Sequence, residues 1–207
     1  MSASLRRALD TPGAGDPRDR REGPSAPGTG VLGMAIFLAS LAVLFAASIA
    51  GYLVVRLRAE AWPPPGMPRL PGGLVAATAI LIACSVTIHL ALTSVRRGEI
   101  SRMVRWLWVT TALGVLFLAS QAVNWWGLVA SHAGASANLY AFTFFMLTGL
   151  HAAHVVGGLI QLGFVTARAR RGRYGSGRHP GVTYAAMYWH FLDAVWLVLL
   201  AVLVVFG

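Results

Sequence analysis

Two histidines that lie three residues apart, His151 and His154, are of a type that could do chemistry. Imidazole binds haem iron, copper and zinc, and it transfers protons near neutral pH. A second segment contains His190 and Asp193, again three residues apart, among apolar and aromatic neighbours. Residues with this spacing share one face of a helix, so each pair could act together if its segment is helical.

The segments that hold these residues are apolar enough to cross a membrane. Of the 207 residues, 57% are hydrophobic and 12% are charged, and the mean hydropathy is +0.65, which is too apolar for a soluble domain. A β-barrel would need alternating segments, and residues 41–47 do not alternate. We therefore expect an all-α integral membrane protein, a bundle of five transmembrane helices. The predicted spans are roughly Val31–Val55, Leu74–Val95, Leu107–Ala130, Tyr140–Thr166 and Val182–Phe206.

The placement of the basic residues predicts the orientation of the helices. The net charge of +10 comes from arginines that gather before the first span, between the second and third, and between the fourth and fifth. These three segments lie on one side of the membrane, and the positive-inside rule makes that side cytoplasmic. We expect a cytoplasmic N-terminus and an external C-terminus, although Arg56, Arg58 and Arg69 run against the bias. Arginines dispersed among loops suit anionic lipid headgroups better than nucleic acid.

The chain divides into a tail and a membrane domain. Residues 1–30 combine Pro, Gly, Ser and Asp with arginine and have too little apolar surface to fold, so we expect a disordered basic cytoplasmic tail. Residues 31–207 form the predicted membrane domain. Within it, the prolines of Ala61–Pro68 predict an extended external loop. The single cysteine, Cys84, lies inside the second span and cannot form an intrachain disulfide.

Two hypotheses remain for the histidines, ligation and packing. His151 and His154 cannot both be axial ligands of one haem, because axial ligands approach the ring from opposite faces. A metal site would need further ligands, and no third residue stands at a convincing spacing. The alternative is that these histidines form hydrogen bonds between helices. We expect no catalytic residue, no cofactor site and no metal site in this chain.

The predicted depths place the four residues of both pairs in one band of the membrane. His190 and Asp193 lie about 12 Å and 16 Å from the cytoplasmic end, and His154 and His151 about 18 Å and 22 Å from it. We expect the last two spans to pack antiparallel, with His151 or His154 near His190 or Asp193. An Asp–His hydrogen bond would lower the cost of burial. A proton relay is the alternative, but Asp193 is the only carboxylate in the predicted spans.

Both segments resemble the signature motifs of subunit III of the haem–copper oxidases, the family of cytochrome c and quinol oxidases. Residues 148–158 are similar to Thr-Gly-x-His-x-x-His-Val, and residues 188–196 to Tyr-Trp-His-Phe-Val-Asp-x-Val-Trp. Weaker similarity at 33–40, 83–87 and 113–121 extends the resemblance to nearly everything after the tail, and five spans match the short bacterial form. The matching residues, which we interpret as a structural polar cluster, are Thr148, Gly149, His151, His154, Trp189, His190, Asp193 and Trp196.

The sequence departs from the family at three positions where membrane glutamates are common. Leu41, Asn124 and Thr183 stand there instead. The loss of all three carboxylates argues against a role of this chain in proton uptake. It also suggests a divergent member of the family, nearer to the accessory subunits found with nitric oxide reductases.

The resemblance implies a non-catalytic subunit of an aerobic respiratory complex in the bacterial inner membrane. Such a subunit packs beside catalytic subunit I and also near subunit II, binds phospholipid, and supports assembly and stability, while haem and copper belong to the partner subunits. An accessory subunit of a nitric oxide reductase is one alternative. A b-type haem carrier or a proton channel is an alternative of another class. The sequence leaves the electron donor, cytochrome c or quinol, open.

Overall fold

The computed structural model describes residues 29–65, 72–131, 134, 136 and 138–207. Within these residues, all five helices are long and apolar enough to cross a membrane, which confirms the predicted all-α membrane bundle. The helices are α2 (Thr29–Arg58), α3 (Gly73–Arg96), α4 (Ile100–Ala130), α5 (Leu139–Arg170) and α6 (Pro180–Phe206). The predicted disordered tail lies outside the described residues, except for its last two positions, which belong to α2.

The helices extend beyond the apolar stretches from which they were predicted. α4 begins at Ile100 instead of Leu107, and α5 continues past Thr166 to Arg170. Hydropathy identifies the part of a helix that suits hydrocarbon. The helix itself continues for as long as its backbone can form hydrogen bonds four residues apart. The additional turns carry arginines, whose long side chains can reach the membrane–water interface.

Glycines in the left-handed conformation end both α3 and α5. Gly98 has φ 77° and Gly172 has φ 67°. At the end of α3, the Gly98 N–H donates to the Val95 carbonyl at 3.0 Å and the Glu99 N–H to the Ser94 carbonyl at 2.9 Å. This pair of bonds is the Schellman motif, which satisfies the last carbonyls of a helix and needs positive φ. An equivalent pair ends α5.

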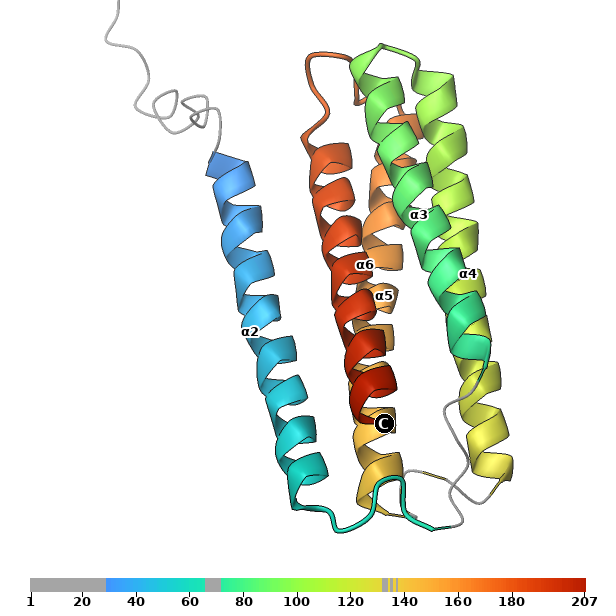
Figure 1. The fold of residues 1–207 in the computed structure, drawn as a ribbon. Coiled ribbons are helices and arrows are strands. Elements are labelled where there is room, and N and C mark those ends of the chain that lie inside the picture. The colour runs from blue at the N-terminus through green and yellow to red at the C-terminus, as the bar shows by residue number, and fades with distance from the viewer. Residues whose placement is uncertain (1–28, 66–71, 132–133, 135, 137) are drawn as a thin grey trace, which may run out of the picture.

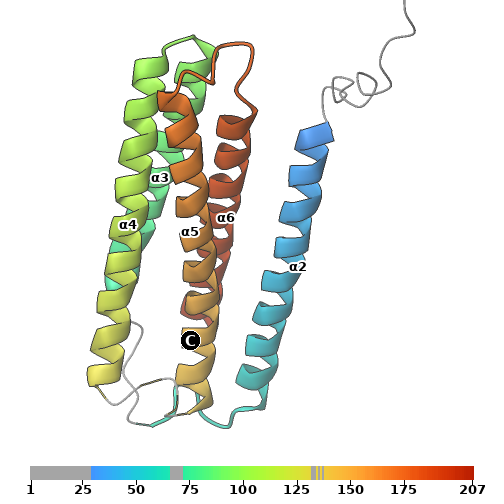
Figure 2. The same cartoon turned by 180° about the vertical axis from the view of Figure 1, so that it is seen from behind.

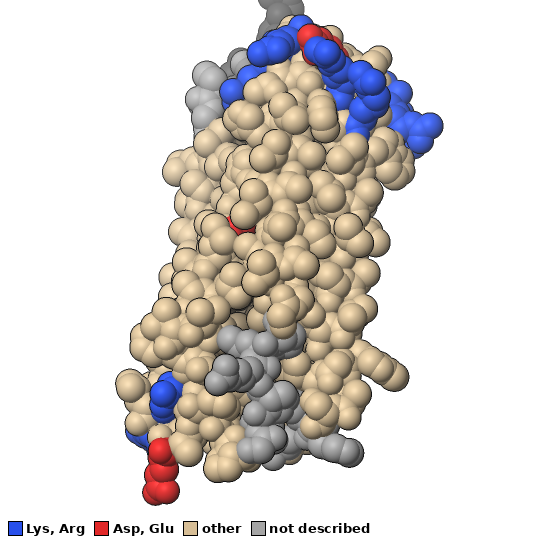
Figure 3. All heavy atoms as spheres, turned by 45° about the vertical axis from the view of Figure 1, so that its right-hand side comes forward, with Lys and Arg blue, Asp and Glu red and all other residues tan. Residues whose placement is uncertain are grey.

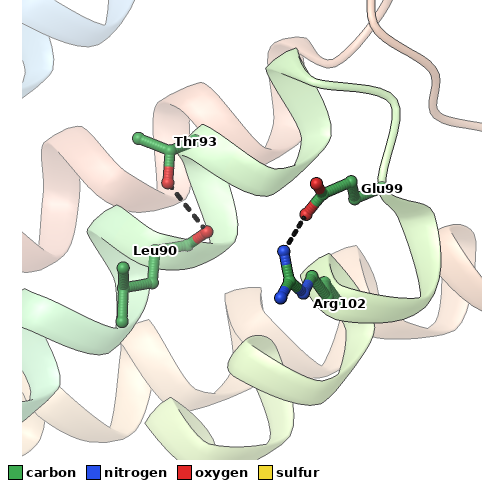
Figure 4. Close-up of polar contacts among 4 residues, drawn as sticks. All are labelled: Leu90, Thr93, Glu99 and Arg102. Carbon is green, nitrogen blue, oxygen red and sulfur yellow. Dashed lines mark hydrogen bonds and ion pairs between the residues drawn. The ribbon is translucent and has the colours of Figure 1, made fainter.

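The turn between α3 and α4 is short and charged (Figure 4). Arg102 Nη1 donates to Glu99 Oε2 at 2.9 Å, and both side chains are exposed to a third or more. Thr93, near the end of α3, donates its hydroxyl hydrogen to the Leu90 carbonyl of its own helix at 3.1 Å. Exposed ion pairs contribute little to stability, so this turn depends mainly on its glycine and the packing of α3 against α4.

Four helices form a bundle and the fifth rests on its side. α3 packs against α4 and α6, and α5 packs against the same two helices. α2 contacts α6 and α5 only, and the two opposite views show it standing apart from α3 and α4 (Figures 1 and 2). Consecutive helices are antiparallel, so the predicted antiparallel pairing of the last two spans is confirmed. The start of α2 and the end of α6 lie at opposite ends of the bundle.

The charged side chains gather at the ends of the bundle. Figure 3 shows basic side chains concentrated at one end of the visible face, with a broad and nearly uncharged band below them. The end that holds the α3–α4 and α5–α6 turns includes Arg96, Arg97, Arg102, Arg105, Arg168, Arg170, Arg171, Arg173 and Arg178. Arg56 and Arg58 lie at the opposite end, where α2 finishes. The asymmetry that the sequence predicted is therefore present in the folded chain.

Candidate functional site: polar contacts between the helices

The aromatic and histidine residues of the α6 motif connect this helix to α3. The indole Nε1 of Trp196 donates to Thr78 Oγ1 at 2.9 Å. Two turns nearer the start of α6, Nδ1 of His190 and the Ser85 hydroxyl are 2.7 Å apart and share a hydrogen bond. Because α3 and α6 are antiparallel, residues 190 and 196 meet residues 85 and 78 in reverse order. The motif therefore fixes the register of these two helices.

The predicted Asp–His hydrogen bond is wrong. Asp193 is 8% exposed, and neither of its carboxylate oxygens has a hydrogen-bond partner among the described residues. The polar side chain beside it is Ser85, which bonds to His190. The prediction failed because a spacing of three residues places two side chains on the same face of a helix but does not make them point toward each other. The His190 side chain points toward α3, where it bonds to Ser85. The ring of His151 lies against Trp196, and the ring of His154 lies against Phe45.

His151 lies at the centre of the bundle in a cage of aromatic rings. It is fully buried, and its ring centroid is 6.2 Å from that of Phe45 in α2, 5.7 Å from Phe117 in α4 and 5.1 Å from Trp196 in α6. Neither ring nitrogen has a hydrogen-bond partner among the described residues. His151 therefore connects four helices by ring contacts, not by the interhelical hydrogen bond expected from the sequence.

His154 lies one turn further along α5 and faces α2. Its Nδ1 is 2.8 Å from the Leu150 carbonyl of its own helix, and its ring centroid is 5.1 Å from that of Phe45. The backbone carbonyl of His154 accepts a hydrogen bond from the Tyr188 hydroxyl at 2.9 Å. That bond joins α5 to α6, so the two motifs do meet, although through the backbone of one and the tyrosine of the other.

The first two residues of the α5 motif behave differently from each other. Thr148 is fully buried and accepts a hydrogen bond from Trp125 Nε1 of α4 at 3.1 Å, while it donates to the Phe144 carbonyl. A Cβ added at Gly149 would meet no atom within 4 Å. Thr148 thus joins α5 to α4, whereas no residue in the described part of the chain requires a glycine at position 149.

The remaining motif residue, Trp189, fits between two glycines. It is fully buried, and a Cβ at Gly114 of α4 would approach its ring to 2.8 Å. A Cβ at Gly158 of α5 would approach the same ring to 3.3 Å. These two glycines let α4 and α5 pack closely around the indole, as small residues do in membrane bundles.

The three positions that lack the family glutamates lie in different surroundings. Leu41 is partly buried against the core. Asn124 is 9% exposed and contacts Gly73 at the start of α3, and its Nδ2 has no partner among the described residues. Thr183 donates to the His179 carbonyl at 3.3 Å in the first turn of α6. The structure brings none of the three together with Asp193.

The partners of the motif residues are polar side chains that the sequence did not mark as a site. Thr78, Ser85 and Trp125 each accept or donate a bond across helices. One sequence signal could have identified these partners, namely a hydroxyl or indole group inside an apolar span. Such a group needs a hydrogen-bond partner in the membrane. Among the described residues, no three His, Cys, Asp or Glu side chains are grouped so that they could bind a metal ion.

The fold and these contacts define a multi-pass helical membrane protein whose polar side chains hold its helices in register. Several named proteins are similar to this chain in sequence. The "Cytochrome c oxidase subunit 3" of Thermostichus vulcanus is 35% identical over 84% of this chain and 85% of its own length. That of Synechocystis sp. is 35% identical over 84% of this chain and 74% of its own. The "Probable cytochrome c oxidase subunit 3" of Nocardia farcinica is 31% identical over 94% and 96%.

The chain belongs to the cytochrome c oxidase subunit III family, whose model matches residues 28–207. The resemblance expected from the two motifs is thereby confirmed. Membership favours a haem–copper oxidase subunit III over the nitric oxide reductase, haem-carrier and proton-channel alternatives. A subunit III works in a complex with other oxidase subunits.

Proposed function

We propose that this chain is the non-catalytic subunit III of an aerobic respiratory oxidase that transfers electrons from cytochrome c to oxygen. It packs beside catalytic subunit I, near subunit II, and supports assembly and working life of the complex. Haem and copper are bound by those partner subunits. The names of the similar proteins support cytochrome c as the donor over quinol.

One observation supports a structural role above all others. Three buried motif residues contact other helices of the same chain: Thr148 meets α4, His151 meets α2, α4 and α6, and Trp196 meets α3. A catalytic residue would instead present its reactive atoms to an open site. The motifs therefore serve to hold the bundle in one arrangement that a partner can recognise.

A crevice beside α2 is suited to a phospholipid chain. It has a volume of about 240 Å³ and is lined by Met34 and Phe37 of α2, Gly157 and Gln161 of α5, and Tyr188 of α6. The crevice lies in the half of α2 that leads to the arginine-rich end, where a lipid phosphate would find basic side chains. A lipid held here would fill space beside the one helix that has few protein neighbours.

The arginine-rich end is proposed to face the cytoplasm of a bacterial cell, with the chain in the inner membrane. This places the start of α2 inside and the end of α6 outside. Reporter fusions test the orientation directly. Alkaline phosphatase fused after Gly207 should be active, and green fluorescent protein at the same position should not fluoresce after Sec export. The reverse pattern would overturn the proposed orientation.

Purification of the complex tests the proposed function. An affinity tag on this chain should recover other oxidase subunits from mild detergent, together with their haem absorbance and an oxidase activity that reduced cytochrome c sustains. The purified chain alone should show no Soret band. A Soret band stoichiometric with the isolated chain, or recovery without any oxidase subunit, would contradict the proposal. Activity with quinol alone would contradict the assignment of the donor.

A further inference from the structure

The outer face of α6 lies between α2 and α3 and has a mixed character. Four α6 residues point out of the bundle along this strip: His190 is half-buried, Leu197 is 47% exposed, and Ala194 and Ala201 are exposed. The neighbouring edge of α3 adds Ile82 and His89, which are also exposed. We call these six residues the α6 outer face. Figure 1 shows α6 between α2 and α3.

Two histidines on this face are polar groups at a depth where lipid offers no partner. His89 lies seven residues before Arg96, about 10 Å along α3 from the arginine-rich end. Its ring centroid is 6.2 Å from that of His190, and no hydrogen bond from the described residues reaches its ring nitrogens. An exposed imidazole in hydrocarbon is unfavourable unless it is paired. The pair therefore indicates that something other than acyl chains covers this face.

The shape of the same region suits a helix. On its α2 side, an apolar groove of about 230 Å³ runs between α2 and α6. Three alanines, Ala42, Ala46 and Ala194, line it together with the larger apolar residues Phe45, Ile49, Phe191, Val195 and Val198. Small side chains let a neighbouring helix approach closely, which is the main source of packing energy between helices in membranes. A helix seated over Ala194 would have the two histidines beside it.

We propose that the α6 outer face docks one transmembrane helix of another oxidase subunit, which presents a hydrogen-bond acceptor to His89 and His190. The acceptor is a carboxylate, an amide or an exposed backbone carbonyl at that depth. The inference rests on the proposed function, because it requires that this chain be assembled with other oxidase subunits. The inference adds which side of the bundle the other oxidase subunits contact and which chemical groups make that contact. The α4 and α5 outer faces are left to lipid.

Site-specific photo-crosslinking in the assembled complex tests which face is covered. Benzoylphenylalanine at Ile82 or Leu197 should crosslink to another oxidase subunit on illumination of membranes. The matched controls are Val115 of α4 and Ile160 of α5, which are 54% and 57% exposed on the other side of the bundle. They should give no crosslink to protein. Crosslinks from the control positions alone, crosslinks to a second copy of this chain, or products with lipid only at all four positions would overturn the proposal.

A substitution tests the role of the imidazole. His89→Leu removes the donor and leaves an apolar side chain, so the isolated subunit should unfold at an unchanged or higher temperature. The fraction retained by the complex through a detergent wash should fall roughly three- to twentyfold, the range for one hydrogen bond between helices in a membrane. Trp108→Leu is the matched control, since Trp108 is 53% exposed on α4 about 12 Å from the same end. It should leave retention unchanged.

The outcomes separate this inference from the proposed function. Failure of the wild-type chain to copurify with any oxidase subunit would contradict the function itself. If copurification is unchanged in His89→Leu, the proposed docking face is wrong but the proposed function stands. The same holds if Trp108→Leu weakens copurification as much as His89→Leu does. Loss of retention with a matching loss of thermal stability in the isolated His89→Leu subunit would assign His89 to folding and also overturn the docking role.

Discussion

Trp196 donates its indole hydrogen to the Thr78 hydroxyl at 2.9 Å, although 118 positions separate the two residues in the chain. The same hydroxyl donates to the Leu74 carbonyl at 2.8 Å, so both its hydrogen and its lone pair are used. A direct hydrogen bond thus joins the last helix, α6, to the second membrane helix, α3. Its energy can be measured.

The Trp196–Thr78 bond should show positive coupling in a double-mutant cycle. Thr78→Val and Trp196→Phe each remove it, and the coupling free energy of unfolding should be about 0.6 kcal/mol, with an upper bound of about 1.7 kcal/mol. Reversible unfolding of the purified subunit in mixed detergents measures this. Thr93→Val is the control, because Thr93 bonds within its own helix (Figure 4). A coupling as large for Thr93 with Trp196 would mean that the cycle reports general loosening.

The glycines around Trp189 should not tolerate a methyl group. Gly114→Ala places a Cβ 2.8 Å from the Trp189 ring and 2.9 Å from Leu159, so it should destabilise the subunit by about 1–3 kcal/mol. Gly149→Ala is the matched change on an open part of α5. It should be neutral or stabilise by up to about 1 kcal/mol, since alanine favours helix. Equal unfolding free energies for the two variants would show that Trp189 can move aside.

Replacement of Asp193 by Leu should leave the isolated subunit as stable as before or more stable. No described residue gives its carboxylate a hydrogen bond, and a charge at this depth costs about 2.5–3.5 kcal/mol. His190→Leu should be the more damaging change, because it breaks the 2.7 Å contact with Ser85. Unfolding free energies of the two purified variants test the order. A loss above about 1 kcal/mol for Asp193→Leu would reveal a partner for this carboxylate.

Deletion of the gene should leave part of the initial oxidase turnover but shorten its lifetime. A subunit that only supports its neighbours is not needed for the elementary redox step. Oxygen consumption by membranes, followed over many turnovers, should therefore start measurably and decay faster than in the wild type. Complete loss of initial turnover in membranes that still contain subunit I would contradict the structural role.

Substitutions at the three positions that lack the family glutamates should not affect proton translocation by the oxidase. Leu41→Ala and Thr183→Ala should change the proton-to-electron ratio of reconstituted oxidase by less than the error of the assay, and so should Asn124→Ala. Their side chains offer no carboxylate, and no hydrogen bond or ion pair joins them to one among the residues that the structure describes. A large drop in the ratio for any of the three would mean that the chain carries protons by another route.

The spans and their pairing were predictable because they depend on one-dimensional properties. Twenty or more apolar residues identify a span, and short connections make consecutive spans antiparallel. The depth calculation placed His151, His154, His190 and Asp193 in one band for the same reason, since height follows from a constant rise per residue.

The partners of those residues were not predictable, because depth does not fix direction around a helix. α6 carries one imidazole and one carboxylate, those of His190 and Asp193, and is otherwise largely apolar, so its sequence has no broad polar face that would show which neighbour each residue meets. His190 meets Ser85 of α3, and His151 meets rings from three other helices. Ser85 and Thr78 carried too little signal on their own to be paired with residues more than a hundred positions away.

The isolation of α2 from α3 and α4 has a consequence for biosynthesis. The ribosome delivers α2 before the other four described helices, yet the helices that α2 packs against, α5 and α6, are the last of these five to leave the translocon. During most of synthesis α2 must stay in the bilayer without a protein neighbour, with Phe45 unable to reach its ring partners His151 and His154. The order of insertion therefore leaves an interval in which a membrane chaperone could hold α2, and the bundle closes around Phe45 only when translation ends.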